Sequence, residues 1–125
     1  MISNLSETEI SDFLIQVATQ NSWDLSVHKE IVDEKVLVLW KIKVGEENRN
    51  FLVVHKGTDP LRIDLRVNEN LSKILKEKFE SVMSSNVMSP KTWCEIICSG
   101  QITKEELLDL IRAGIEIVLA ESPRV

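Results

Sequence analysis

The feature of this sequence that most constrains its fold is a change in the spacing of its apolar residues. Between residues 23 and 67, apolar side chains recur at every second position, which is the period of strands with one buried face. Polar segments interrupt this pattern at residues 32–34, 45–50 and 57–60, where glycine, proline and acidic residues favour turns. The sequence therefore predicts four consecutive strands joined by short loops, which is an antiparallel meander.

Helical spacing appears on both sides of the predicted meander. Three segments place apolar residues at the i, i+3, i+4 spacing of one helical face: 10–18, 71–83 and 107–119. Ser6 with Glu9, and Thr103 with Glu106, match the capping box that begins many helices. We therefore expect one helix before the meander and two helices after it.

Residues 91–99 are compatible with either a helix or a strand. Pro90 suits the first position of a helix, but the segment that follows is short, rich in β-branched residues and closed by Gly100. We predict a fifth strand, which gives the element order α-β-β-β-β-α-β-α. This order is typical of an α+β fold with helices packed on one face of an antiparallel sheet. No linker or repeat divides the chain, so residues 1–125 are expected to form one domain.

The charge balance narrows the class of partner. The chain has 15 Lys and Arg against 20 Asp and Glu, a net charge of −5, which opposes non-specific binding to nucleic acid or to anionic lipid. The first residues lack the basic region and apolar run of a signal peptide, and no apolar stretch is long enough to cross a bilayer. We expect a cytoplasmic protein that binds neither nucleic acid nor membrane.

The order of these elements resembles the fold of type III secretion chaperones, which small archaeal and bacterial proteins share. The resemblance covers the whole chain and depends on the order of helices and strands. It implies a homodimer that binds segments of other proteins and has no enzymatic activity. It implies no role for any particular residue.

Few residues are arranged for chemistry. Cys94 and Cys98 have no second cysteine pair to complete a zinc site, so we interpret both as small core residues. His28 and His55 lack a nucleophile or carboxylate at a meaningful spacing, and His55 is expected at the core side or the edge of the sheet with a hydrogen-bond partner. A metal site that joins Asp59 and Asp64 with Glu30 has no support beyond proximity in the meander. We predict no catalytic, cofactor or metal site.

Alternation divides the predicted sheet into two faces. One face is expected to be covered by helices: Val36, Val38, Trp40, Ile42, Phe51, Val53, Ile63 and Leu65. The other combines basic with aliphatic side chains, and we predict that it binds an acidic or partly apolar protein: Leu37, Leu39, Lys41, Lys43, Leu52, Val54, Lys56, Arg62 and Arg66. A solvated face, on which basic stems cover aliphatic side chains, is the alternative. This division requires an odd loop or a bulge within residues 57–61.

The last predicted helix is apolar around most of its circumference, which requires burial on two sides. Gly114 at its middle indicates close approach of another backbone. Either the first two helices or a second subunit would cover its second side, and we predict a homodimer with Leu110, Gly114 and Ile117 at its interface. The first functional hypothesis is a non-enzymatic, chaperone- or adaptor-like protein-binding module. The alternative is a ligand-binding protein or enzyme with a pocket between sheet and helices near Trp40 and His55.

Overall fold

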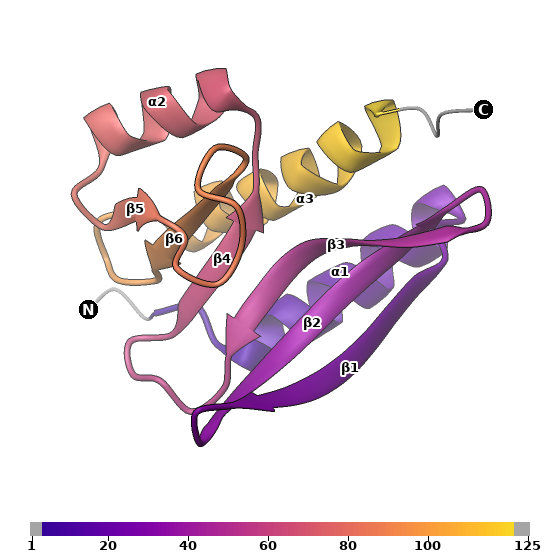
Figure 1. The fold of residues 1–125 in the computed structure, drawn as a ribbon, viewed down its shortest axis with the longest axis horizontal. Coiled ribbons are helices and arrows are strands. Elements are labelled where there is room, and N and C mark those ends of the chain that lie inside the picture. Colours follow the sequence, from indigo (N-terminus) through magenta and orange to yellow (C-terminus); the bar gives the residue numbers. More distant parts are fainter. Residues whose placement is uncertain (1–3, 122–125) are drawn as a thin grey trace.

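The computed structural model describes residues 4–121. Its elements, in chain order, are α1 (Glu7–Asn21), β1 (Leu25–Val32), β2 (Lys35–Val44), β3 (Glu47–His55), β4 (Arg62–Arg66), α2 (Glu69–Lys78), β5 (Val82–Ser84), β6 (Trp93–Ile97) and α3 (Lys104–Ala120). The strands form one antiparallel sheet of six strands in the order β1-β2-β3-β4-β6-β5 (Figure 1). The predicted α+β fold with an antiparallel meander is confirmed.

The helices pack against the sheet through one large core. Figure 1 shows α1 and α3 behind the strands. Leu14 of α1, Ile111 of α3 and Leu75 of α2 all belong to the same buried cluster. The capping box predicted for the first helix is present: the Ser6 hydroxyl accepts a hydrogen bond from the Glu9 amide at 3.2 Å, and the Glu9 carboxylate accepts one from the Ser6 amide. Thr103 caps α3 through its hydroxyl, which accepts a hydrogen bond from the Glu106 amide. No described helix is long and apolar enough to cross a membrane.

A bulge in β3 determines which side chains the helices cover. Trp40 pairs with Leu52 and Lys41 pairs with Asn50, so Phe51 is an extra residue on β3. As a result, both Phe51 and Leu52 are buried in the main core. The assignment of Leu52 to the open face was therefore wrong.

Because of the same bulge, the side chains of β3 after Phe51 lie on the opposite faces of the sheet from those predicted. Val54 pairs with Ile63 and belongs to the helix-covered core, so its assignment to the open face was also wrong. Val53 belongs to the opposite face, although it was expected under the helices. The irregularity was expected within residues 57–61, but β3 and β4 are joined by the six residues 56–61, and the bulge lies at Phe51.

The face opposite the helices has a small core of its own. The loop of residues 85–92 crosses this face, and Met88 packs on a second buried cluster: Leu37, Leu39, Val53 and Trp93. In Figure 1 this loop passes in front of β4 and β6. The aliphatic residues expected to lie open for a partner, Leu37 and Leu39, are thus buried.

The region after β4 differs from the prediction in one element. The predicted fifth strand exists as β6, but residues 82 and 83 were expected to be helical and instead belong to β5. The helix ends at Lys78, and Val82 then pairs with Ile96. Strand pairing at the edge of the sheet outweighs the helical spacing of these apolar residues.

Gly114 does make a close backbone approach, but within the same chain. A Cβ atom at this position would lie 2.8 Å from the carbonyl oxygen of Arg66 and 3.1 Å from Cδ1 of Leu65. Gly114 is buried against β4, so its placement at a dimer interface was wrong. Leu110 packs against the core while partly exposed, and Ile117 is also partly exposed.

The two cysteines are buried free thiols, as predicted. The Cys94 thiol donates a hydrogen bond to the Ser72 hydroxyl at 3.3 Å, which ties α2 to β6. Burial raises the pKa of the Cys98 thiol to about 12. Both residues therefore act as small components of the core.

Candidate functional site

The outer strand β1 presents an exposed edge. It pairs with β2 on one side, and within residues 4–121 no strand pairs with its other side. All of its eight residues except Leu25 are exposed, and Ile31 keeps 77% of its surface accessible. Val27 and Val32 are further large apolar side chains that lie exposed on this strand. Unpaired backbone groups beside exposed apolar side chains are a template for pairing with another strand.

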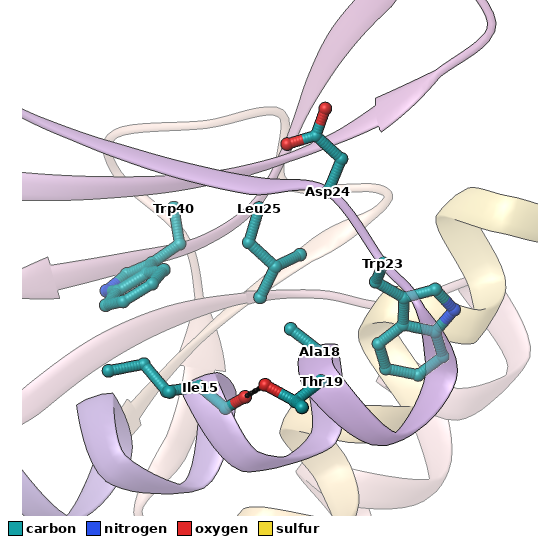
Figure 2. A pocket seen from close by; sticks show the side chains of 7 residues that line it. All are labelled: Ile15, Ala18, Thr19, Trp23, Asp24, Leu25 and Trp40. Atoms are coloured by element: carbon teal, nitrogen blue, oxygen red, sulfur yellow. Dashed lines mark hydrogen bonds between the residues drawn. The ribbon is translucent and has the colours of Figure 1, made fainter.

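A groove runs between this strand and α1. Figure 2 shows that its lining comes from α1, from β1, from the segment between them and from Trp40 of β2. The groove encloses about 260 Å³ and is lined by Ile15, Ala18, Thr19, Trp23, Asp24, Leu25 and Trp40. Ile15 is 59% exposed, although it faces this groove. Two indole rings and several aliphatic groups thus form an apolar surface beside the open edge of β1.

Positive charge lies at the centre of the β1 edge. Lys29 pairs with Val38, so its side chain lies on the helix-covered face together with those of Val27 and Ile31. The pKa of Lys29 is lowered below its ordinary value, chiefly by the neighbouring Lys56 amine, whose charge repels that of Lys29. Two neighbouring amines at an exposed edge favour an acidic group in any partner.

The basic face predicted from the sequence does not form as one surface. Lys56 follows His55 at the end of β3 and lies on the helix-covered side, so its assignment to the basic face was wrong. Arg62 pairs with His55 and donates a hydrogen bond to Glu95 at 2.7 Å, while Arg66 is ion-paired with Glu121. Two of the predicted lysines lie together on the other face: Lys41, which is partly exposed, and Lys43, which is exposed.

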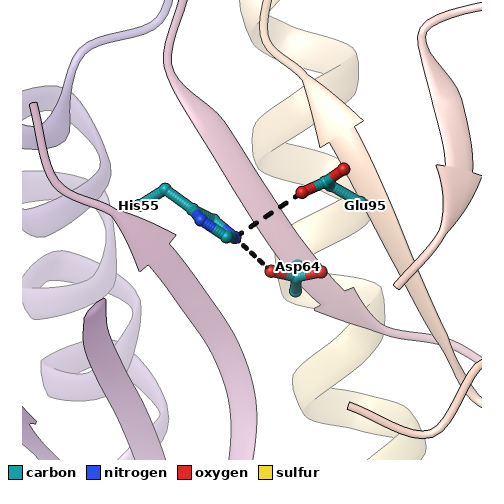
Figure 3. A group of neighbouring side chains, drawn as sticks. All are labelled: His55, Asp64 and Glu95. Atoms are coloured by element: carbon teal, nitrogen blue, oxygen red, sulfur yellow. Dashed lines mark hydrogen bonds and ion pairs between the residues drawn. The ribbon is translucent and has the colours of Figure 1, made fainter. Parts of the chain in front are cut away.

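A buried polar cluster occupies the face opposite the helices. Figure 3 shows His55 of β3, Asp64 of β4 and Glu95 of β6 pointing toward one another. The Nε2 atom of His55 is hydrogen-bonded to Oδ2 of Asp64 and lies 3.8 Å from Oε1 of Glu95. Asp64 is fully buried and Glu95 nearly so, while the His55 side chain is 13% exposed. Asp64 and Glu95 are direct cross-strand neighbours.

Further groups hold each carboxylate by its second oxygen. The Ser85 hydroxyl donates to Oδ1 of Asp64 at 2.7 Å, and Arg62 holds Oε2 of Glu95. The Ser85 oxygen also accepts hydrogen bonds from the amides of Val87 and Met88. This hydroxyl is therefore committed to fixing the loop of residues 85–92 and is not arranged as a nucleophile.

The sequence-based interpretation missed this cluster for one reason. Its assignment of faces placed His55 with Trp40, which implied a common pocket between sheet and helices. The bulge at Phe51 turns His55 to the opposite face, so His55 does not line the groove in which Trp40 lies. With the register corrected, alternation places His55 and Asp64 on one face, where cross-strand diagonals meet.

No family model and no curated protein matches the sequence. Among solved structures, the chain is similar to Deinococcus radiodurans protein DR2400, which has a DUF419 domain. The match has a TM-score of 0.66 and 16% sequence identity, and it covers 86% of this chain and 79% of the other. A match at this identity shows that the two chains share a fold. The resemblance to type III secretion chaperones stays a prediction.

Proposed function

We propose that this protein is a non-enzymatic protein-binding module of the cytoplasm, whose β1 edge pairs with an extended segment of a partner protein. The observation that carries the proposal is the open edge of β1, eight residues long and exposed along almost its whole length. Added strands gain affinity from backbone hydrogen bonds and specificity from alternate side chains. A chaperone or an adaptor uses such a site.

The side chains of β1 define the chemistry of the partner segment. Val27, Lys29 and Ile31 lie on the same face at successive alternate positions. A strand paired with them stabilises the complex best when it places an acidic residue beside Lys29 and apolar residues on either side. The partner is therefore an extended segment with the pattern apolar-x-acidic-x-apolar.

The groove beside β1 supplies a second contact. Leu25 belongs both to β1 and to the groove wall, next to Trp40 and Ile15. A bulky apolar side chain one step beyond the paired segment reaches this surface. Aromatic and aliphatic walls of this kind anchor the apolar residues of bound peptides.

Pairing of β1 with β1 of a second copy is the less favourable use of the edge. The antiparallel register that stacks Val27 on Ile31 of the other copy also places the two Lys29 side chains opposite each other. Like charges directly opposite destabilise a pair of strands. The predicted homodimer stays a prediction, with Leu110 and Ile117 of α3 as its remaining contacts, and light scattering at micromolar concentration tests it.

A charge exchange tests the proposed function. The probe is a ten-residue peptide of alternating valine and threonine with glutamate at one central inward position, compared with the same peptide carrying lysine there. Tryptophan fluorescence reports binding, because Trp23 and Trp40 line the groove. The wild-type protein should prefer the glutamate peptide by about 1 kcal/mol, roughly fivefold in Kd.

Lys29→Glu should reverse this preference, while Lys43→Glu should leave it unchanged. Lys43 is a suitable control because it is exposed and pairs within the sheet on the opposite face. Binding of neither peptide would contradict the proposal. So would a preference that Lys29→Glu does not alter.

A further inference from the structure

The buried cluster on the opposite face has the donor set of a metal site. An imidazole nitrogen from His55 and carboxylate oxygens from Asp64 and Glu95 come from three neighbouring strands, and these atoms all lie within 4.8 Å of one another. Imidazole with carboxylate ligands is a combination that binds divalent first-row metals. The three strands already hold the donors on one side of the sheet, as Figure 3 shows.

The distances suit one ion. Zn²⁺ binds such ligand atoms at about 2.0–2.2 Å, so two ligand atoms on one ion lie about 3–4 Å apart. Nε2 of His55 and Oε1 of Glu95 are separated by 3.8 Å. Nε2 of His55 and Oδ2 of Asp64 are in hydrogen-bond contact, and an ion bound to both atoms would take the place of this hydrogen bond.

The surroundings match those of a ligated metal. Each carboxylate leaves one oxygen for the common point and has its other oxygen fixed by a donor, Ser85 for Asp64 and Arg62 for Glu95. Hydrogen bonds of this kind orient the ligands of metal sites. The partly exposed ring of His55 provides the side from which an ion enters.

The charges of the cluster also call for a cation. Asp64 and Glu95 are neighbouring buried carboxylates, and buried charges of one sign require compensation. Arg62 contacts Glu95 from the rim, where its side chain is 41% exposed and its charge is screened by solvent. Asp64 lies deeper, where its Oδ2 contacts the His55 ring and its Oδ1 accepts a hydrogen bond from the Ser85 hydroxyl. A divalent ion between the three donors would lie next to both carboxylates and add positive charge there.

We propose that His55, Asp64 and Glu95 form a binding site for one divalent first-row transition-metal ion, with Zn²⁺ as the probe. The ion joins β3, β4 and β6 at their shared face. Through Asp64 and Ser85 it also supports the loop of residues 85–92. The site is separate from the proposed partner surface on β1.

Calorimetric titration of the metal-free full chain with ZnCl₂ tests the proposal. The wild type should bind one Zn²⁺ per chain, and saturating Zn²⁺ should raise the melting temperature because the ion binds the folded chain preferentially. His55→Gln and Glu95→Gln should each lower the affinity at least tenfold, as loss of a ligand requires. The matched control is His28→Gln, which removes the exposed histidine beside Glu30 and should leave the affinity unchanged.

A second readout does not depend on the variants folding. Nitrogen-detected NMR of the wild-type histidine side chains should show a Zn²⁺-induced shift at Nε2 of His55 and none at His28. Absence of binding at one ion per chain would overturn the proposal. So would binding that His28→Gln abolishes, or binding that leaves the His55 nitrogen signal unchanged.

Discussion

Gly114→Ala tests the packing of α3 on β4, because two opposing effects can be separated there. In an exposed helix interior, alanine in place of glycine stabilises by about 1 kcal/mol. At Gly114 the added methyl group would lie 2.8 Å from the Arg66 carbonyl oxygen, which belongs to a strand backbone, and 3.1 Å from Leu65. Overpacking of this kind costs about 1–3 kcal/mol, and the rigid backbone contact favours the upper part of that range.

The net expectation is a loss of about 1–2 kcal/mol, which for 125 residues lowers Tm by about 4–8 °C. The contribution of helix propensity to the free energy of unfolding can be measured in the same helix by comparing Glu116→Gly with Glu116→Ala. Glu116 is exposed, and both variants lose its contact with Arg112, so that their difference isolates helix propensity. Urea unfolding of the three variants provides the comparison. If Gly114→Ala stabilises the protein by as much as the pair at residue 116 differs, the close approach of α3 to β4 is refuted.

Three further predictions concern the core and the surface. Cys94 and Cys98 should not react with a thiol reagent at pH 8 in the folded protein, because both are buried and the pKa of Cys98 is raised to about 12; both should react in guanidinium. The Lys104 contact lowers the pKa of Glu9 below its ordinary value of 4.5, so the stability that this pair contributes should be present above pH 4.5 and lost on further acidification. Lys104→Met should therefore destabilise the protein at pH 6, and the loss should become progressively smaller in acid. Phe51→Ala should cost about 3–5 kcal/mol in urea unfolding, because its ring is completely buried at the bulge.

The sequence is informative wherever local chemistry and periodicity agree. Ser6 and Thr103 cap the helices that their sequence patterns predict, and the alternation across residues 23–67 corresponds to four paired strands. The predicted strand over residues 91–99 is also present as β6. These features depend on neighbours in the chain, which the sequence displays directly.

The assignment of faces could not be obtained in the same way. It depends on the position of a single extra residue, and Phe51 follows the alternation as well as its neighbours do. The bulge arises from the pairing of β3 with β2. Because it shifts the alternation by one residue, Val54 lies under the helices in place of Val53, and His55 lies on the opposite face. The register expected from the sequence therefore placed His55 and Asp64 on different faces of the sheet. β5 was not predicted for a related reason, because its three residues, Val82–Ser84, form a strand only by pairing with β6.

The proposed partner surface on β1 and the buried cluster that includes His55 of β3 lie on either side of β2. This arrangement raises the question of whether a change in one site affects the other. Leu37 of β2 pairs with Glu30 of β1 on one side and with His55 of β3 on the other. However, Lys29 projects from the helix-covered face and His55 from the opposite face, so the two side chains share no polar partner. We therefore expect Lys29→Glu and His55→Gln to have additive effects on the free energy of unfolding, within about 0.3–0.5 kcal/mol. A double-mutant cycle in urea measures this, and an interaction energy above about 1 kcal/mol would show that β2 transmits strain between the partner edge and the buried cluster.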